Sequence, residues 1–326
     1  MKVLAIDIGG TKSALALCTV SEGRIESLSA RTSLVSRDYT SLVAMIKNWQ
    51  IQHPGQDFDA VGAGVAGPVV RHRAHLTNLG WDIDAVKISQ EIGKPVKICN
   101  DMQSHGFGIL GLTKENIRTL NVGAPIEGAK ALIAAGTGLG EAVIGWNGES
   151  YFPTAGEGGH SSFSPTTDQE IRLLEFLRGR LHGHVSWERV LGGLDGWKNL
   201  ALFLAQESSQ DLATYLNLET PDWGAMLVEA AQRGDQFADK VIEFYAVLYG
   251  KEAANLALKC MPCAGVYLGG GIAPKIIPWL EKYFMIGFRD KGRFGPLLDQ
   301  TPVHVILDSL NGLKGAALQF ASGHVS

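Results

Sequence analysis

Short apolar runs that stop at glycines mark the beginning of the chain. Residues 3–6 form one such run, and residues 14–18 form another after Gly9 and Gly10. Continuous apolar runs of this length, bounded by turn residues, are typical of buried strands. The pattern therefore predicts two strands joined by a tight glycine turn.

The same unit returns 127 positions later, counted from Gly9 to Gly136. Residues 131–135 and 142–144 are apolar, and the turn between them is rich in glycine. Similar apolar runs predict further strands at residues 60–65, 96–99, 266–268 and 303–307.

Helical spacing of apolar residues appears between these strands. Residues 42–49 place apolar side chains on one helical face, with Ser36 or Asp38 as a possible N-cap. Thr167 and Glu170 form a capping box before an amphipathic stretch. Longer and shorter helices are expected at residues 237–258 and 313–320. Strands that alternate with helices, some joined by tight turns, predict a mixed α/β architecture.

Composition describes a globular protein and excludes several classes of function. The 326 residues, 45% of them hydrophobic and 19% charged, favour two folded domains. A net charge of −4 without long runs offers no basis for binding nucleic acid or an anionic membrane. The four cysteines are too scattered for a disulfide framework, and no apolar segment reaches the roughly 20 residues of a membrane span. We expect a soluble, cytoplasmic protein.

Glycine is in excess, with 40 residues where average usage of roughly 7% gives about 23. Successive glycines in a turn leave backbone N–H groups free to surround a phosphate. Two turns of this kind occur in the chain, and each carries a threonine hydroxyl. We expect the following residues to bind the phosphates of a nucleotide: Gly9, Gly10, Thr11, Gly136, Thr137, Gly138 and Gly140. A simple tight turn is the alternative for either one taken alone.

Other polar residues at strand ends extend this prediction. Asp7 ends the first strand, where a carboxylate could hold Mg²⁺ through water. A glycine triple follows a later buried strand and allows close approach of an adenine or its ribose, or else serves only as a connection: Gly269, Gly270 and Gly271. Asn100 and Asp101 follow another strand, where a general base could reach a substrate hydroxyl, although such pairs also form ordinary turns.

The glycine-rich loop at residues 156–160 contains Glu157 and His160. A carboxylate and an imidazole on such a loop suit hydrogen bonding to vicinal hydroxyls. A zinc site is the competing interpretation, but two ligands cannot close one. Glu188 alone would be taken for solvated surface.

Three other patterns favour ordinary structure over function. Residues 62–67 match the spacing of a dinucleotide-binding fingerprint, but Pro68 and the residues after it do not predict the helix that such a site needs. Cys260 and Cys263 have no partner pair and are expected to be ordinary thiols. His182 and His184 are expected on the surface. No Walker-type phosphate loop occurs.

The ordered set of motifs resembles the bacterial glucokinases, ATP-dependent members of the hexokinase, actin and heat-shock chaperone fold superfamily. The similarity runs from residues 7–11 to residues 312–317. Its specific parts are residues 100–101, 135–140, 156–160, 185–190 and 269–272. The resemblance implies a two-domain, actin-like (ribonuclease H-like) α/β fold with mixed sheets and a cleft between the domains. Residues 1–106 with 308–326 would form the small domain, and residues 107–307 the large one.

The resemblance also assigns roles to individual residues. Asp101 matches the base, and the residues that hold sugar hydroxyls match Asn100, Glu157, His160 and Glu188. The implied reaction is phosphoryl transfer from MgATP to the 6-hydroxyl of glucose, with domain closure over the sugar. A homodimer is implied as well.

Two features of the sequence bear on this resemblance. Lys12 stands where an asparagine is common in the family, so the contact with the γ-phosphate could differ in charge. The cysteine-rich zinc motif of the related repressors and sugar kinases is absent, which favours the zinc-free glucokinases.

Rival functions remain open at this point. A kinase for mannose or glucosamine is the main alternative. A sugar sensor on the same fold is less favoured because the first strand begins at Lys2, with no room for an upstream helix-turn-helix. An actin-like or chaperone-like ATPase is disfavoured by Asn100, Asp101 and the loop that carries Glu157.

Overall fold

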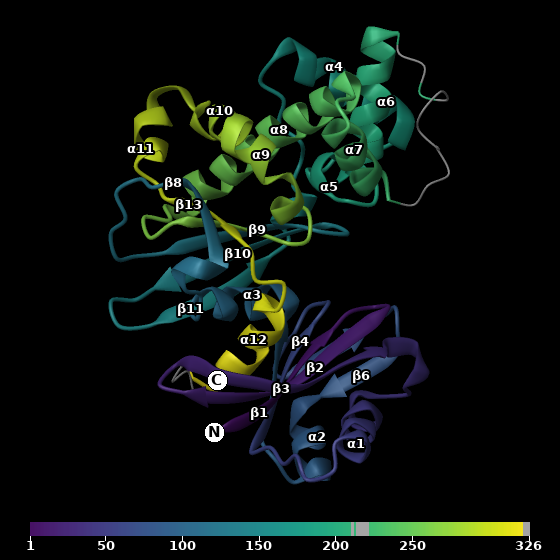
Figure 1. Ribbon diagram of the computed structural model, residues 1–326, viewed down its shortest axis with the longest axis vertical. Helices are drawn as coiled ribbons and strands as arrows, with labels where there is room; N and C mark the ends of the chain where they lie inside the picture. The colour runs from purple at the N-terminus through teal and green to yellow at the C-terminus, as the bar shows by residue number, and fades with distance from the viewer. Residues whose placement is uncertain (210–211, 213–221, 322–326) are drawn as a thin grey trace. The chain divides into compact units, whose positions relative to one another are not determined.

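The computed structural model describes residues 1–209, 212 and 222–321, and the chain forms two compact units (Figure 1). Unit 1 consists of Met1–Asn116, Ile144–Ala155 and the chain from Asp308 onward. Unit 2 consists of Ile117–Val143 and Gly156–Leu307. Each unit has its own hydrophobic core.

Unit 1 is built on a five-stranded mixed sheet with the order β3-β2-β1-β4-β7. Its strands are β1 (Lys2–Ile8), β2 (Lys12–Ser21), β3 (Arg24–Val35), β4 (Ala60–Val65) and β7 (Val96–Asn100). β1 is antiparallel to β2 and parallel to β4, which is parallel to β7. The carboxyl ends of β1, β4 and β7 therefore meet at one edge, where Asp7, Gly64 and Cys99 are in register.

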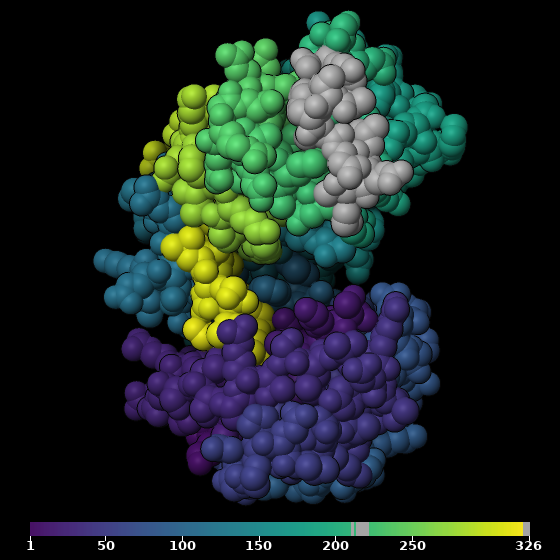
Figure 2. All heavy atoms as spheres, turned by 45° about the vertical axis from the view of Figure 1, so that its right-hand side comes forward, coloured from purple at the N-terminus to yellow at the C-terminus, as the bar shows by residue number. Residues whose placement is uncertain are grey.

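Helices cover the sheet of unit 1 and form two core clusters. The helices are α1 (Leu42–Gln52), α2 (Ala85–Ile92), α3 (Asp101–Ile109) and α12 (Asn311–Leu318), with η1 (Ser36–Asp38), η2 (Lys114–Asn116) and the hairpin of β5 (Arg73–Leu76) and β6 (Trp81–Asp84). The C-terminal helix α12 packs on β1 and β2, although almost 300 residues separate them, and its yellow segment lies against the purple strands (Figure 2). The close packing of α12 requires glycine at position 62, because a Cβ there would overlap the carbonyl oxygen of Ala316.

Unit 2 contains most of a six-stranded sheet with the order β11-β10-β9-β12-β13-β8. The strands are β8 (Ile117–Asn121), β9 (Lys130–Ala135), β10 (Leu139–Trp146), β11 (Tyr151–Gly156), β12 (Val266–Gly269) and β13 (Val303–Ile306). β12 lies between β9 and β13 and is parallel to both, whereas β8 is antiparallel to β13. β9 and β12 are entirely buried or nearly so, as expected of central parallel strands.

The long helix α8 (Gln236–Cys260) runs through the core of unit 2 (Figure 1). Its Tyr245 stacks on Trp197 of the neighbouring helix α6, with ring centroids 3.9 Å apart. The other helical elements are η3 (Gly158–His160), α4 (Asp168–Leu181), α5 (Glu188–Leu191), α6 (Gly196–Ser208), α7 (Trp223–Gln232), η5 (Ala273–Ile276), α9 (Ile277–Trp279), η6 (Leu280–Phe284), α10 (Met285–Arg289), η7 (Gly292–Phe294) and α11 (Gly295–Asp299).

The strands and helices expected from the apolar pattern are confirmed, including both glycine hairpins and the capping box of α4. The predicted cap of the first helix is wrong. Ser41, not Ser36 or Asp38, accepts the hydrogen bond from the Ala44 N–H at the start of α1, while Ser36 and Asp38 belong to η1. Within the described ranges, no helix combines the length and apolar character that a membrane crossing requires.

Candidate active site

The first glycine hairpin, between β1 and β2, is held by backbone and hydroxyl contacts. The Gly9 N–H donates to the Lys12 carbonyl at 3.1 Å, and the Ser36 hydroxyl donates to the Gly9 carbonyl at 2.7 Å. A Cβ at Gly9 would come within 2.7 Å of the Lys12 oxygen. Only glycine therefore allows this turn to close so tightly.

Asp7 is the next-to-last residue of strand β1, next to this hairpin. Its side chain is partly buried, and burial raises the pKa of its carboxyl group. Among the described residues, no hydrogen bond or ion pair to its carboxylate is found. A partly buried carboxylate without a protein partner is suited to a cation and its waters, so the residues fit the predicted Mg²⁺.

Asn100 and Asp101 stand where β7 ends and α3 begins, at the same sheet edge as Asp7. Asn100 is the N-cap of α3: its side chain accepts from the Met102 N–H at 2.8 Å and donates to the Gly67 carbonyl at 3.1 Å. Gln103 completes a capping box. The Asn100 amide thus fixes the first helical residue, Asp101, whose Oδ1 accepts from the Met102 N–H at 2.9 Å.

The second hairpin joins β9 to β10 in unit 2. The Gly136 N–H donates to the Gly138 carbonyl at 2.9 Å. The segment after α5 crosses this turn, because Gly193 and Leu194 donate backbone hydrogen bonds to the carbonyls of Gly136 and Thr137 at 2.8 and 3.1 Å. Thr137 is therefore fixed through its backbone.

Three predicted sugar-binding residues come together beside this second hairpin. His160 lies between two carboxylates, with Nε2 3.8 Å from Glu157 and Nδ1 3.8 Å from Glu188. The Glu157 and His160 side chains are 75% and 59% exposed, and that of Glu188 is 27% exposed. Carboxylates and an imidazole that face solvent at this spacing can bind several hydroxyls of one small polar molecule.

Glu188 also binds the hairpin itself, which the sequence did not indicate. Its Oε2 accepts from the Leu139 N–H at 3.1 Å, directly after the glycine turn. A side chain at Gly138 would overlap this carboxylate. Glu188 thus links the group around His160 to the predicted phosphate-binding turn.

A cavity of about 460 Å³ extends from the same turn. Of the predicted nucleotide residues, Gly136, Thr137 and Gly271 line it. Its other walls are Gly193, Leu194, Trp197, Asp222, Gly224, Ala225, Val228, Ile272, Lys275 and Ile276. Apart from Ile272, which ends the motif at residues 269–272, the sequence alone did not indicate these residues. The double glycine at residues 192–193 was the available signal. A largely apolar cavity of this size suits a flat ring such as adenine.

Gly269 and Gly270 are not among the residues that line this cavity. Gly270 has a positive φ of 80°, and a Cβ there would overlap the Ala135 carbonyl. These two glycines thus allow β12 to end close against β9, which leaves Gly271 at the cavity wall.

The other patterns have structural explanations. In the fingerprint-like stretch at residues 62–67, a Cβ at Gly64 would come within 2.9 Å of the Ser104 side chain. No helix directly follows Gly67. Cys260 and Cys263 are half-buried free thiols. His182 and His184 are exposed, as expected. Within residues 1–209, 212 and 222–321, no group of three or more His, Cys, Asp or Glu side chains is placed to hold a metal ion.

Comparisons with known proteins agree on one family. The family model described as Glucokinase matches residues 4–322. A protein named Glucokinase from Trichormus variabilis is 38% identical, over 97% of this chain and 98% of its own length.

Solved structures show the same fold. A glucokinase from an Antarctic psychrotroph superposes with a TM-score of 0.85 at 27% identity, covering 98% of both chains. A glucokinase of the ROK family from Streptomyces griseus, solved with glucose and AMPPNP, gives a TM-score of 0.65 at 24% identity over 97% of this chain and 98% of its own. The expected actin-like, two-domain α/β fold with mixed sheets is thereby confirmed.

Proposed function

This chain belongs to the glucokinase family and catalyses ATP-dependent phosphorylation of glucose, and from that premise we propose that Asp101 is the general base for attack by the 6-hydroxyl. The products are glucose 6-phosphate and ADP. The observation that carries the assignment of the sugar and phosphate sites is the group formed by Glu157, His160 and Glu188. Glu188 in this group also accepts a hydrogen bond from the Leu139 N–H of the glycine hairpin. Sugar-binding and phosphate-binding groups are thus adjacent in unit 2.

Asp101 is suited to its role by its place in the fold. It opens α3 at the end of a buried strand, and the capping box of Asn100 and Gln103 fixes the backbone on which it stands. In phosphoryl transfer the transition state is loose, so catalysis depends mainly on alignment and on charge stabilisation. Asp101 accepts the proton of the hydroxyl as the new bond to the γ-phosphorus forms and the bond from that phosphorus to the bridging oxygen breaks, which releases ADP.

The remaining polar groups orient the sugar. Glu157, His160 and Glu188 bind hydroxyls, and Asn100 does so through the face of its amide that capping leaves available. Water competes with the sugar as acceptor, so a site that is complete only with sugar bound limits wasteful ATP hydrolysis.

The nucleotide is held by the two glycine hairpins and by the cavity of about 460 Å³. Backbone N–H groups bind the phosphates around Gly9, Gly10 and Thr11 and around Gly136, Thr137, Gly138 and Gly140. Gly269, Gly270 and Gly271 shape the end of β12 beside the adenine. When bound near Asp7, through water, Mg²⁺ supplies positive charge to the β- and γ-phosphates.

Further properties belong to the same proposal. The proposed small domain is residues 1–106 with 308–326, and the proposed large domain is residues 107–307. This division differs from that of the compact units at residues 107–116 and 144–155, which belong to unit 1. The enzyme works in the cytoplasm as a homodimer, with no nucleic acid or membrane partner.

The test is ADP production from MgATP across a panel of glucose, mannose and glucosamine. We expect turnover to be fastest with glucose. Stronger turnover with another hexose would change the substrate and keep the mechanism, whereas ADP production independent of any sugar would contradict the proposal.

A further inference from the structure

Two glutamates share a buried place behind the loop that carries Glu157 and His160. Glu141 lies on β10 and Glu252 on α8, and they are 3% and 0% exposed. Their carboxyl groups contact each other. One oxygen of each, Oε1, is buried and receives no hydrogen bond from a donor group in the described part of the chain.

Two ionised carboxylates cannot remain side by side in such a place. Each loses its hydration, and like charges at contact distance repel strongly, so a buried pair keeps one proton between its two members. Burial and the charge of Glu141 raise the pKa of Glu252 to about 8. Burial likewise raises the pKa of Glu141. At neutral pH the pair thus carries one proton and one negative charge.

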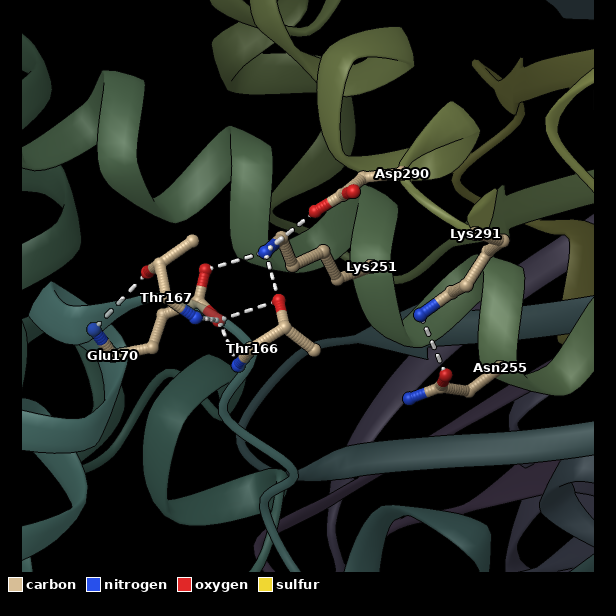
Figure 3. A network of polar contacts seen from close by, with 7 residues as sticks. All are labelled: Thr166, Thr167, Glu170, Lys251, Asn255, Asp290 and Lys291. Carbon is tan, nitrogen blue, oxygen red and sulfur yellow. Dashed lines mark hydrogen bonds and ion pairs between the residues drawn. The ribbon is translucent and has the colours of Figure 1, made fainter. Parts of the chain in front are cut away.

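The groups around the pair do not remove this need for a proton. Asn255 donates to Glu252 Oε2 at 2.7 Å. The Oδ1 of Asn255 accepts from Lys291 Nζ at 2.7 Å (Figure 3). Lys259 on α8 is the cation that acts on both carboxyls. Tyr249 and Cys260, also on α8, feel the charge of Glu141, and burial raises the pKa of each, so both stay neutral.

The Glu141 side chain also packs directly against the glycine-rich loop of residues 156–160. A Cβ at Gly158 would overlap its Oε2, and a Cβ at Gly159 would overlap the Leu139 carbonyl. The turn that follows is tight, since the His160 N–H donates to the Glu157 carbonyl at 3.0 Å. The positions of Glu157 and His160 therefore depend on where the Glu141 carboxyl lies.

We propose that Glu141 and Glu252 form a proton-sharing pair that positions the loop of residues 156–160 for sugar binding; the sugar-binding part rests on the function proposed above. With the proton in place, Glu252 donates to Glu141 and holds it against α8. Without the proton, the two anions repel each other. Glu141 then shifts against Gly158, where no free space exists, and displaces Glu157 and His160. Both glutamates are positioning residues.

The experiment measures the dissociation constant for glucose by calorimetry from pH 7 to pH 9. In the wild type we expect glucose affinity to fall by at least about fivefold, the lower end of usual coupling between two sites. The midpoint should lie near pH 8. Glu252→Gln keeps a donor for Glu141 but cannot ionise, so its affinity should match the wild type at pH 7 and stay constant to pH 9.

The control is Glu243→Gln, the same chemical change elsewhere on α8, which should keep the wild-type pH profile. A wild-type affinity that is constant from pH 7 to pH 9 would overturn the proposal. So would a Glu252→Gln enzyme with an unchanged pH profile. Dependence of affinity on K⁺ or Na⁺ instead of pH would place an ion, not a proton, between the carboxylates and would also overturn it.

A second measurement separates this inference from the proposed function and does not depend on a folded variant. Infrared spectroscopy of the wild-type protein without sugar or ATP should show a protonated carboxylic acid C=O band that disappears between pH 7 and pH 9. Absence of that band at pH 7 would contradict the shared proton. If the band is present but no glucose binds at any pH, the proposed function fails and the positioning role fails with it, while the shared proton stands.

Discussion

Replacing Lys251 by methionine tests the ion pair that joins α8 to the start of α4. Lys251 Nζ lies 2.6 Å from Glu170 Oε1 and 3.0 Å from Asp290 Oδ2, and it donates to the Thr166 hydroxyl at 2.6 Å (Figure 3). The side chains of Lys251 and Glu170 are only 4% and 3% exposed. Methionine keeps most of the apolar stem and removes the charge.

The expected cost follows from what remains around Glu170. Its Oε2 still accepts from the Thr166 N–H at 2.7 Å and from the Thr166 hydroxyl at 3.1 Å, but the carboxylate is left buried without a counter-ion. Breaking a buried pair on one side costs about 3–5 kcal/mol. Because the backbone hydrogen bond survives, we expect a loss near the lower end, about 3 kcal/mol of unfolding free energy.

The assay is equilibrium unfolding in urea of the full chain, followed by circular dichroism. The matched control is Arg172→Met, which breaks the more exposed pair of Arg172 and Glu207 and should cost about 0.2–1 kcal/mol. The double variant Lys251→Met with Glu170→Leu should recover much of the loss, because no buried charge is left unpaired and the other partner, Asp290, is 54% exposed. A Lys251→Met protein as stable as the Arg172→Met control would refute the reasoning.

Three further predictions concern stability, sugar and nucleotide. Because the folded-state pKa of Glu252 is raised from 4.5 to about 8, its stabilising contribution is full below pH 4.5 and is lost as the pH rises to about 8. Relative to Glu252→Gln, the wild type should therefore lose about 1.4 kcal/mol of unfolding free energy per pH unit in that window, and equal slopes would contradict it. Glu157→Gln should raise the KM for glucose more than the KM for ATP in steady-state assays; the reverse order would remove Glu157 from the sugar site. Ile272→Trp, which puts a larger side chain at the wall of the cavity of about 460 Å³, should raise the KM for ATP and leave glucose binding unchanged by calorimetry, and an unchanged KM for ATP would place the adenine elsewhere.

Local patterns explain why much of the fold was predictable. Apolar runs and turn glycines predict the strands around Gly9 and Gly136. The capping box predicts the helix that begins after Thr167. β3 was not predicted because it alternates exposed and half-buried residues without a continuous apolar run. Such an edge strand is fixed by its hairpin pairing with β2, and its own residues carry no apolar signal for that pairing.

The candidate site divides in the same way. Motif residues such as Glu157 and His160 were predicted, and the structure brings them together with Glu188. The bond from Glu188 to the Leu139 N–H and the contact of Glu141 with Glu252 join positions about 50 and 110 residues apart, so they depend on tertiary packing. For Gly62 the spacing resembled a ligand-binding motif, whereas the physical reason for glycine there is close packing of α12.

The most direct test of the central claim compares the wild type with Asp101→Asn in two measurements on the same preparations. Glucose binding by calorimetry should be nearly unchanged, because asparagine keeps the shape of the side chain. Glucose-dependent ADP production should fall by about 10²–10⁴-fold, the usual contribution of a general base. An Asp101→Asn enzyme that binds glucose and turns over at nearly the wild-type rate would contradict the account.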